Sequence, residues 1–172
     1  MKPQAVLTVE IAGVDTTGPV EGFGPSSRQF GSKSAGMVLG QVSLGGILVV
    51  DDEPANRKLL RLILEAAGYD ILEAEDGQEA INVLSGGENP MTVDLILTDL
   101  NMPRVDGFEA IAFFQNEYPG IPVIVLTGIG HREAETSFRR QGVSDYLVKP
   151  VDVRILIASV TNAIAQRQLS CA

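Results

Sequence analysis

Residues 46–54 are Gly46-Ile47-Leu48-Val49-Val50-Asp51-Asp52-Glu53-Pro54. Four branched apolar residues in a row are typical of a strand that is covered on both faces of a parallel sheet. Proline is favoured in the first turn of a helix, and apolar residues then recur at helical spacing until Gly68 ends the pattern. The segment therefore predicts a buried strand followed directly by a helix, with two adjacent aspartates at the turn between them.

The same strand–helix unit recurs along the rest of the chain. Further strands are predicted at residues 70–74, 93–98, 122–126 and 146–148, and further helices at residues 77–84, 107–116, 131–141 and 153–168. Strict alternation with short connections predicts a parallel sheet with helices on both faces. The expected fold class is α/β, a doubly wound five-stranded parallel sheet flanked by five helices in the flavodoxin-like arrangement.

Residues 1–45 differ in composition from the rest of the chain. They hold 8 of the 18 glycines and 3 of the 9 prolines, and their charges sum to zero. Such a segment buries too little apolar surface to offset the conformational entropy that an ordered chain loses. We expect a low-complexity, mostly disordered extension over residues 1–45, one domain over residues 46–168 and a short tail over residues 169–172.

The whole chain is acidic, with 22 Asp and Glu against 13 Lys and Arg and a net charge of −9. An acidic surface repels phosphate backbones, so a nucleic-acid partner is not expected. Cys171 is the only cysteine, so a disulfide scaffold is excluded, and no run of about 18 apolar residues predicts a membrane span. Because the first residues also lack a secretory signal, we expect a cytoplasmic protein.

Polar side chains follow four of the five predicted strands, where parallel sheets bind their ligands. Asp51 and Asp52 follow the first strand, Asp99 the third, Thr127 the fourth and Lys149 the fifth. Three carboxylates that lie close together repel one another, and Mg²⁺ relieves this by binding carboxylate, water and phosphate oxygens. A carboxylate can also act as the nucleophile that forms an aspartyl-phosphate. The pattern therefore predicts a site for Mg²⁺ and a phosphoryl group at this edge.

Four segments around these residues resemble the receiver domain of two-component response regulators. They are Ile47-Leu48-Val49-Val50-Asp51-Asp52-Glu53, Leu95-Ile96-Leu97-Thr98-Asp99-Leu100-Asn101-Met102-Pro103 with Asp106-Gly107 beyond, Val125-Leu126-Thr127-Gly128, and Asp145-Tyr146-Leu147-Val148-Lys149-Pro150. The resemblance covers residues 46–168. Residues 169–172 are too few for an output domain, so the expectation is a stand-alone, receiver-only regulator.

The resemblance implies which residues bind the metal and the phosphoryl group. Asp99 is implied to be the phospho-acceptor. Asp51 and Asp52 are implied to bind Mg²⁺, together with Asp99 and the backbone carbonyl of Asn101. Lys149 is implied to contact the phosphoryl group.

The resemblance also implies how the lysine is held and how the signal leaves the site. The peptide bond from Lys149 to Pro150 is implied to be cis. Thr127 and Tyr146 match the two switch positions of the family. On phosphorylation the hydroxyl is drawn inward and the aromatic ring follows, which reshapes the face formed by the fourth helix, the fifth strand and the fifth helix.

These residues predict a single-domain response regulator in a phosphorelay. A sensor histidine kinase or a histidine phosphotransfer protein is the expected phosphoryl donor, and the sequence does not identify the downstream protein partner. The chain is expected to catalyse only its own phosphorylation and dephosphorylation, so it is not expected to be a turnover enzyme. An alternative is a phosphorylation-independent adaptor with the same fold. A hydrolase of the haloacid dehalogenase type is disfavoured, because Glu53 and Pro54 stand where its second aspartate is required.

Simpler interpretations remain open for several of these residues. Asp51 or Asp52 also suits the N-terminus of the following helix. Asn56 fits equally a contact with the site and a solvent-exposed position on the first helical turn. Ile129 lies two residues beyond Thr127. This apolar side chain would not orient an attacking water, so we expect that the phosphoryl group is not especially short-lived.

Overall fold

The computed structural model describes residues 43–86, 92–100, 102, 107–128 and 142–170. Five parallel strands form one sheet in the order β2-β1-β3-β4-β5. The strands are β1 (Gly46–Val50), β2 (Asp70–Ala74), β3 (Leu95–Asp99), β4 (Val123–Thr127) and β5 (Asp145–Val148). The predicted five-stranded parallel sheet is therefore confirmed.

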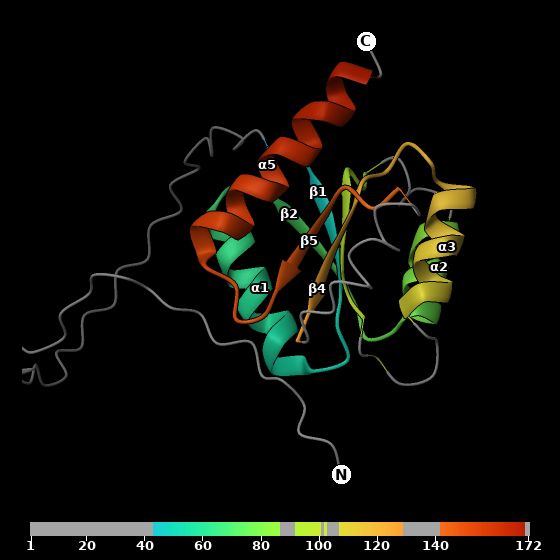
Figure 1. Cartoon of the computed structure of the whole chain (residues 1–172), viewed down its shortest axis with the longest axis horizontal. Coiled ribbons are helices and arrows are strands. Elements are labelled where there is room, and N and C mark those ends of the chain that lie inside the picture. Colours follow the sequence, from blue (N-terminus) through green and yellow to red (C-terminus); the bar gives the residue numbers. More distant parts are fainter. Residues whose placement is uncertain (1–42, 87–91, 101, 103–106, 129–141, 171–172) are drawn as a thin grey trace, which may run out of the picture.

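Helices cover both faces of the sheet. The described helices are α1 (Pro54–Ala66), α2 (Gly77–Ser85), α3 (Gly107–Glu117) and α5 (Val153–Ser170). Figure 1 shows α1 and α5 on one face and α2 and α3 on the other. The helix predicted over residues 131–141 lies outside the described residues, and so do residues 1–42 of the predicted extension. Among the described helices, none has the length and apolar character needed to cross a bilayer.

Two hydrophobic clusters lie on the two faces of the sheet, because side chains alternate along a strand. In β3, Leu97 belongs to the cluster that also contains residues of α1 and α5, whereas its neighbour Ile96 belongs to the cluster with residues of α2 and α3. All residues of β1, β3 and β4 are buried. The continuous apolar runs in the sequence thus correspond to strands covered on both faces, and the sheet forms a rigid base for the residues at its edge.

The β3 strand begins at Leu95, two residues later than the sequence predicted. Asp94 instead bridges to the start of β1: its backbone N–H donates to the Gly46 carbonyl at 2.7 Å, and its carboxylate accepts from the Gly46 N–H at 3.0 Å. A Cβ atom at Gly46 would lie 1.8 Å from the Thr92 carbonyl oxygen, so only glycine allows this approach. One backbone bond and one side-chain bond therefore join Asp94 to Gly46, and the regular pairing of β1 with β3 begins at the next residue, Leu95.

Candidate functional site

The carboxyl ends of β1 and β3 bring three aspartates together. One carboxylate oxygen each from Asp51, Asp52 and Asp99 lies within 4.8 Å of the other two. β1 and β3 are neighbours in the sheet and Val50 pairs with Thr98, so the residues that follow these two emerge side by side. Asp51 and Asp99 are buried, and Asp52 is partly exposed. The structure thus assembles the acidic cluster that the sequence predicted.

Lys149 joins two of these carboxylates. Its ammonium donates to Asp51 Oδ2 at 3.0 Å and to Asp99 Oδ2 at 2.7 Å, and its side chain is 1% exposed. The Lys149 backbone N–H donates to the Thr127 carbonyl at 2.7 Å, and its peptide bond to Pro150 is cis, as the resemblance implied. The lysine is therefore fixed at both its backbone and its charged end.

The alternation of each strand explains why these three side chains meet. Val49, Leu97 and Leu147 all point into the cluster next to α1 and α5. Asp51, Asp99 and Lys149 each stand two residues further along, so a period of two sends them toward the same face. The spacing within each strand end is thus enough to aim both carboxylates and the ammonium at one point.

Burial and crowding shift the pKa values at this site. Burial raises the pKa of Asp51, and the nearby Lys149 only partly opposes this. Burial and the Asp51 charge also raise the pKa of Asp52. For Lys149, burial acts to lower the pKa, but the carboxylates of Asp51 and Asp99 outweigh it and the pKa is raised. The ammonium is therefore held in its charged form, whereas the ionised forms of Asp51 and Asp52 are disfavoured.

This donor set fits a hard divalent cation. Three carboxylates supply only oxygen ligands, and a single ammonium leaves them with surplus negative charge. Mg²⁺ prefers oxygen ligands of this kind and is usually held by a few carboxylates, with waters and phosphate oxygens completing its shell. The fourth ligand expected from the sequence, the Asn101 carbonyl, lies outside the described residues, as does Ile129.

The first turn of α1 holds Asp51 in place. Asn56, which is 3% exposed, approaches both Asp51 carboxylate oxygens with its amide nitrogen at 3.4 Å. Arg57 donates to the Asp51 carbonyl at 2.6 Å, and the Glu53 N–H donates to Asp51 Oδ1 at 2.9 Å. Of the two interpretations left open for Asn56, the structure supports the contact with the site. The sequence interpretation missed Arg57, although its place on the same turn was a usable signal.

Thr127 and Tyr146 lie on the opposite face of the sheet. Val125 pairs with Tyr146 across β4 and β5, and paired residues of parallel strands point the same way. Thr127 stands two residues beyond Val125, so it shares that face with Tyr146. Thr127 is buried, and Tyr146 is half-buried against the cluster next to α2 and α3. The two predicted switch residues are thus neighbours on adjoining strands.

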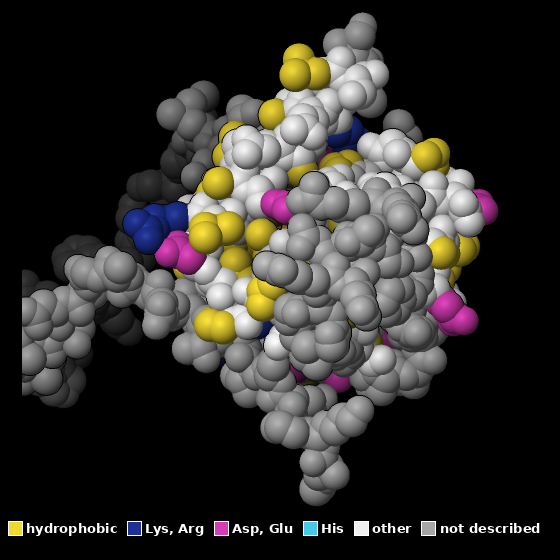
Figure 2. Space-filling view, viewed as in Figure 1, with side chains coloured by type: hydrophobic (Ala, Val, Ile, Leu, Met, Phe, Trp, Pro, Cys, Tyr) yellow, Lys and Arg dark blue, Asp and Glu magenta, His cyan; other side chains and the backbone are white. Residues whose placement is uncertain are grey.

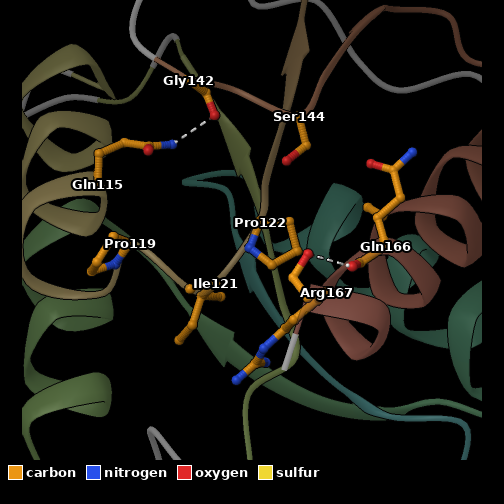
Figure 3. Close-up of a pocket in the computed structure, with 11 residues that line it drawn as sticks. Gln115, Pro119, Ile121, Pro122, Gly142, Ser144, Gln166 and Arg167 are labelled. Atoms are coloured by element: carbon orange, nitrogen blue, oxygen red, sulfur yellow. Dashed lines mark hydrogen bonds between the residues drawn. The ribbon is translucent and has the colours of Figure 1, made fainter. Parts of the chain in front are cut away.

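A separate pocket of about 210 Å³ lies at the amino end of the sheet (Figure 3). It is bordered by the segment before β4, the segment before β5 and the last turns of α5, including Ser144, Gln166 and Arg167, and by Gln115 of α3. Gln115 donates to the Gly142 carbonyl at 3.1 Å, and Arg167 bonds Asp94 at 3.0 Å. No predicted site residue lines this pocket, and two of its long polar side chains already bond the protein itself.

Comparison with known proteins shows which family the chain matches. A family model described as the response regulator receiver domain matches residues 47–161. The transcriptional regulatory protein GlrR of Escherichia coli K12 is 40% identical over 120 residues, which cover 70% of this chain and 26% of that protein. The sensor kinase/phosphatase CqsS of Vibrio cholerae is 35% identical over 117 residues, 66% of this chain and 16% of that protein. The chain thus spans about a quarter or less of these curated relatives.

Solved structures agree with this comparison. A response regulator receiver domain protein from Clostridium thermocellum superposes with a TM-score of 0.68 at 30% identity, covering 73% of this chain and 98% of that one. The response regulator TrrA from Thermotoga maritima, solved in complex with Mg²⁺ and BeF, gives a TM-score of 0.61 at 32% identity and covers 70% of this chain and 99% of that one.

Proposed function

The chain belongs to the response regulator receiver family, and we propose that it accepts a phosphoryl group on Asp99 from a phosphohistidine of a histidine kinase or histidine phosphotransfer protein. The observation that carries this proposal is the buried Lys149 ammonium, which bonds both Asp51 and Asp99. A lysine fixed between two carboxylates, with a third beside them, provides charge of both signs where a phosphoryl group would be received.

In the proposed step, a carboxylate oxygen of Asp99 attacks the phosphorus atom of the donor. An oxygen–phosphorus bond forms and the nitrogen–phosphorus bond of phosphohistidine breaks, so the imidazole nitrogen keeps the electron pair and takes up a proton. Lys149 supplies a fixed positive charge to the phosphoryl oxygens. Asp51, Asp52 and Asp99, with the Asn101 carbonyl, would hold Mg²⁺, which neutralises charge on the transferring oxygens when it is bound.

The proposed switch runs through the opposite face of the sheet. Once Asp99 carries a phosphoryl group, the Thr127 hydroxyl turns to donate to one of its oxygens, and the Tyr146 ring moves into the space that Thr127 leaves. Their shared face on adjoining strands supports this coupling. The change would alter the surface around β5 and α5, where we propose that a downstream protein partner, or a histidine phosphotransfer protein that receives the phosphoryl group, is engaged.

The decisive experiment uses acetyl phosphate as a small-molecule donor. Incubation of the full chain with acetyl phosphate and Mg²⁺ should add about 80 Da to the protein, the mass of one phosphoryl group. Asp99→Asn should abolish this gain, because it removes the nucleophilic oxygen. Asp70→Asn is the matched control, since Asp70 is an exposed aspartate on β2. If the unaltered chain gains no mass, the phosphorylation-independent adaptor becomes the better description.

We also propose the extent and the mode of action of the protein. The receiver unit is residues 46–168, and the chain acts as a stand-alone cytoplasmic regulator that catalyses only its own phosphorylation and dephosphorylation. The family match over residues 47–161 supports the extent of this unit. A fragment of residues 46–168 should gain the same mass as the full chain. Steady hydrolysis of added phosphate esters would contradict the mode of action.

A further inference from the structure

Arg57 of α1 joins a backbone carbonyl of the site to a carboxylate on the neighbouring strand. Its Nη1 donates to the Asp51 carbonyl at 2.6 Å, and its Nε lies 4.0 Å from a carboxylate oxygen of Glu73 on β2. Figure 2 shows that basic side chains are few on the face it draws, and that the largest group of them lies beside acidic side chains. The ion pair with Glu73 fits this pattern, whereas the bond to the Asp51 carbonyl requires a separate explanation.

The end of β2 explains why the Asp51 carbonyl receives a side-chain donor. The Asp51 N–H donates to the Ala74 carbonyl at 3.2 Å, so the hydrogen bonding between β1 and β2 continues one step beyond their last paired residues. In a parallel ladder the carbonyl of that same residue would bond the neighbouring strand two residues further along. Because β2 ends at Ala74, the guanidinium of Arg57 takes the place of that strand donor. Asp51 is buried, and a buried carbonyl without a donor would cost free energy.

The bond from Arg57 fixes a peptide plane that is shared by two aspartates of the acidic cluster. The Asp51 carbonyl and the Asp52 nitrogen belong to the same planar peptide unit, so fixing the carbonyl also fixes where the backbone of Asp52 begins. The carboxylate of Asp51 is held separately, by the Lys149 ammonium and by the Glu53 N–H. Asp52 is partly exposed, so the direction of its side chain depends more on the backbone that carries it.

We propose that Arg57 is a positioning residue, which acts through the peptide between Asp51 and Asp52 to aim the Asp52 carboxylate at a bound cation. The inference rests on the proposed function, in which the acidic cluster holds Mg²⁺. Arg57 is not itself a ligand, because a guanidinium has only donors and stays protonated. Among the described residues it forms an ion pair with Glu73 and with none of the three clustered aspartates. Its effect on the metal must therefore pass through the backbone or through its charge.

The positioning role and the charge of Arg57 predict opposite effects on cation binding. A positive charge near three carboxylates repels a divalent cation, so removal of that charge alone would strengthen Mg²⁺ binding. Loss of the hydrogen bond frees the peptide to turn, and loss of a group that orients a metal ligand weakens metal binding by about tenfold or more. A positioning role therefore predicts weaker Mg²⁺ binding, although the surroundings of the cluster become more negative.

Isothermal titration calorimetry of the full chain with Mg²⁺, without any phosphoryl donor, tests the proposal. Arg57→Met keeps an unbranched stem but removes the donor and the charge, and it should raise the dissociation constant for Mg²⁺ about tenfold. Arg61→Met is the matched control, because Arg61 lies one turn further along α1, pairs with the same Glu73 at 3.4 Å and loses the same charge. It should not raise the dissociation constant. Arg57→Lys keeps a donor and should stay within about threefold of the unaltered chain.

Phosphoryl uptake from acetyl phosphate gives a second readout. The Mg²⁺ concentration that supports half of the maximal uptake rate should rise about tenfold in Arg57→Met. The rate at saturating Mg²⁺ should stay close to that of the unaltered chain, because Asp99 and Lys149 are unchanged. Circular dichroism shows whether each variant is folded, and Arg57→Lys keeps the test valid if Arg57→Met is not.

Three results would overturn the positioning role. Equal dissociation constants for Arg57→Met and Arg61→Met would mean that the bond to the Asp51 carbonyl does not affect the metal. Tighter binding in Arg57→Met would mean that only the charge of Arg57 acts on the cation. A loss that Arg57→Lys does not recover would assign the effect to packing of the side chain. If the unaltered chain binds no Mg²⁺, the metal site of the proposed function fails, and this is known before any variant is compared.

Discussion

At both ends of the sheet, a basic side chain from the last part of the chain reaches an aspartate beside an earlier strand. At the carboxyl end, Lys149 bonds Asp51 and Asp99. At the amino end, Arg167 bonds Asp94 and the Val93 carbonyl. The two contacts resemble each other in topology, since both join distant residues: Lys149 lies 98 and 50 positions from its two aspartates, and Arg167 lies 73 positions from Asp94.

The two ends differ in burial and in charge balance. The Arg167–Asp94 pair is partly exposed, at 21% and 31% of the side chains, and holds one charge of each sign. At the Lys149 site the side chains of Lys149, Asp51 and Asp99 are nearly inaccessible, Asp52 is partly exposed, and three carboxylates stand against one ammonium. An ion pair with one charge of each sign, such as Arg167–Asp94, links two parts of the fold without needing a ligand. A buried excess of negative charge lowers stability unless a cation binds to it. The excess of negative charge therefore distinguishes the candidate site from the structural ion pair.

Among the variants that test this difference between the two ends, Lys149→Met should lower the stability of the protein most. It leaves Asp51 and Asp99 buried without their common partner, and loss of one member of a buried ion pair typically costs about 3 kcal/mol of unfolding free energy. Urea denaturation at pH 7 without Mg²⁺ measures the loss. Lys58→Met, at an exposed position of α1, is the control and should change stability by less than about 0.5 kcal/mol. Equal stability of the Lys149 variant and the unaltered chain would mean that the lysine does not stabilise the buried charges of Asp51 and Asp99.

Mg²⁺ should stabilise the protein through one end of the sheet only. A ligand that binds the folded state alone adds about 2.7 kcal/mol when it is present at a hundred times its dissociation constant. Asp99→Asn should remove most of this gain, because it removes a carboxylate of the cluster. Asp94→Asn should keep it. Thermal unfolding with Mg²⁺ and with a chelator measures both, and equal loss in the two variants would contradict a localised site.

Asn56→Ala should lower the affinity for Mg²⁺ about tenfold, the usual size of an effect from a residue that orients a metal ligand. The amide lies beside both carboxylate oxygens of Asp51, and its loss removes one of the contacts that orient that carboxylate. Asn82→Ala on α2 is the control, since Asn82 is exposed and accepts from Gln78. Isothermal titration calorimetry gives the dissociation constants. An unchanged constant for Asn56→Ala would assign Asn56 a purely structural role.

The sequence predicted the elements and the aspartates at the strand ends because both depend on local patterns. Apolar runs specify buried strands, and a period of two aims Asp51, Asp99 and Lys149 at one face. The predicted strand boundaries agree with the structure to within two residues. The largest difference is at the start of β3, where the side chain of Asp94 bonds Gly46 on the neighbouring strand. Nothing within a few residues of Asp94 indicates that contact.

The contacts that the sequence did not reveal are those between distant residues. Arg167 reaches Asp94 over 73 positions, and no periodicity relates them. The contact of Asn56 with Asp51 was easier to predict, because a position five residues after Asp51 is on the first turn of the following helix. Its burial depends on how α1 packs against the sheet, which the sequence pattern leaves undetermined.

Removal of one negative charge should raise the stability of the protein at the carboxyl end of the sheet and lower it at the amino end. Burial and the nearby Asp51 raise the pKa of Asp52 above its ordinary value of 3.8. The folded state therefore binds this proton more tightly than the unfolded state, so the ionised carboxylate lowers stability at neutral pH. Asp52→Asn should then stabilise the Mg²⁺-free protein by about 1 kcal/mol at pH 7.

The gain from Asp52→Asn should shrink as the pH falls and vanish below the unfolded value of 3.8, where the carboxyl is neutral in both states. Asp94→Asn should instead lower stability by about 0.5 kcal/mol, because it breaks a partly exposed ion pair with Arg167. Urea denaturation of both variants in chelator, from pH 4 to pH 8, measures the two signs. A loss of stability in both would mean that Asp52 is part of a balanced contact, and that surplus charge does not distinguish the two ends.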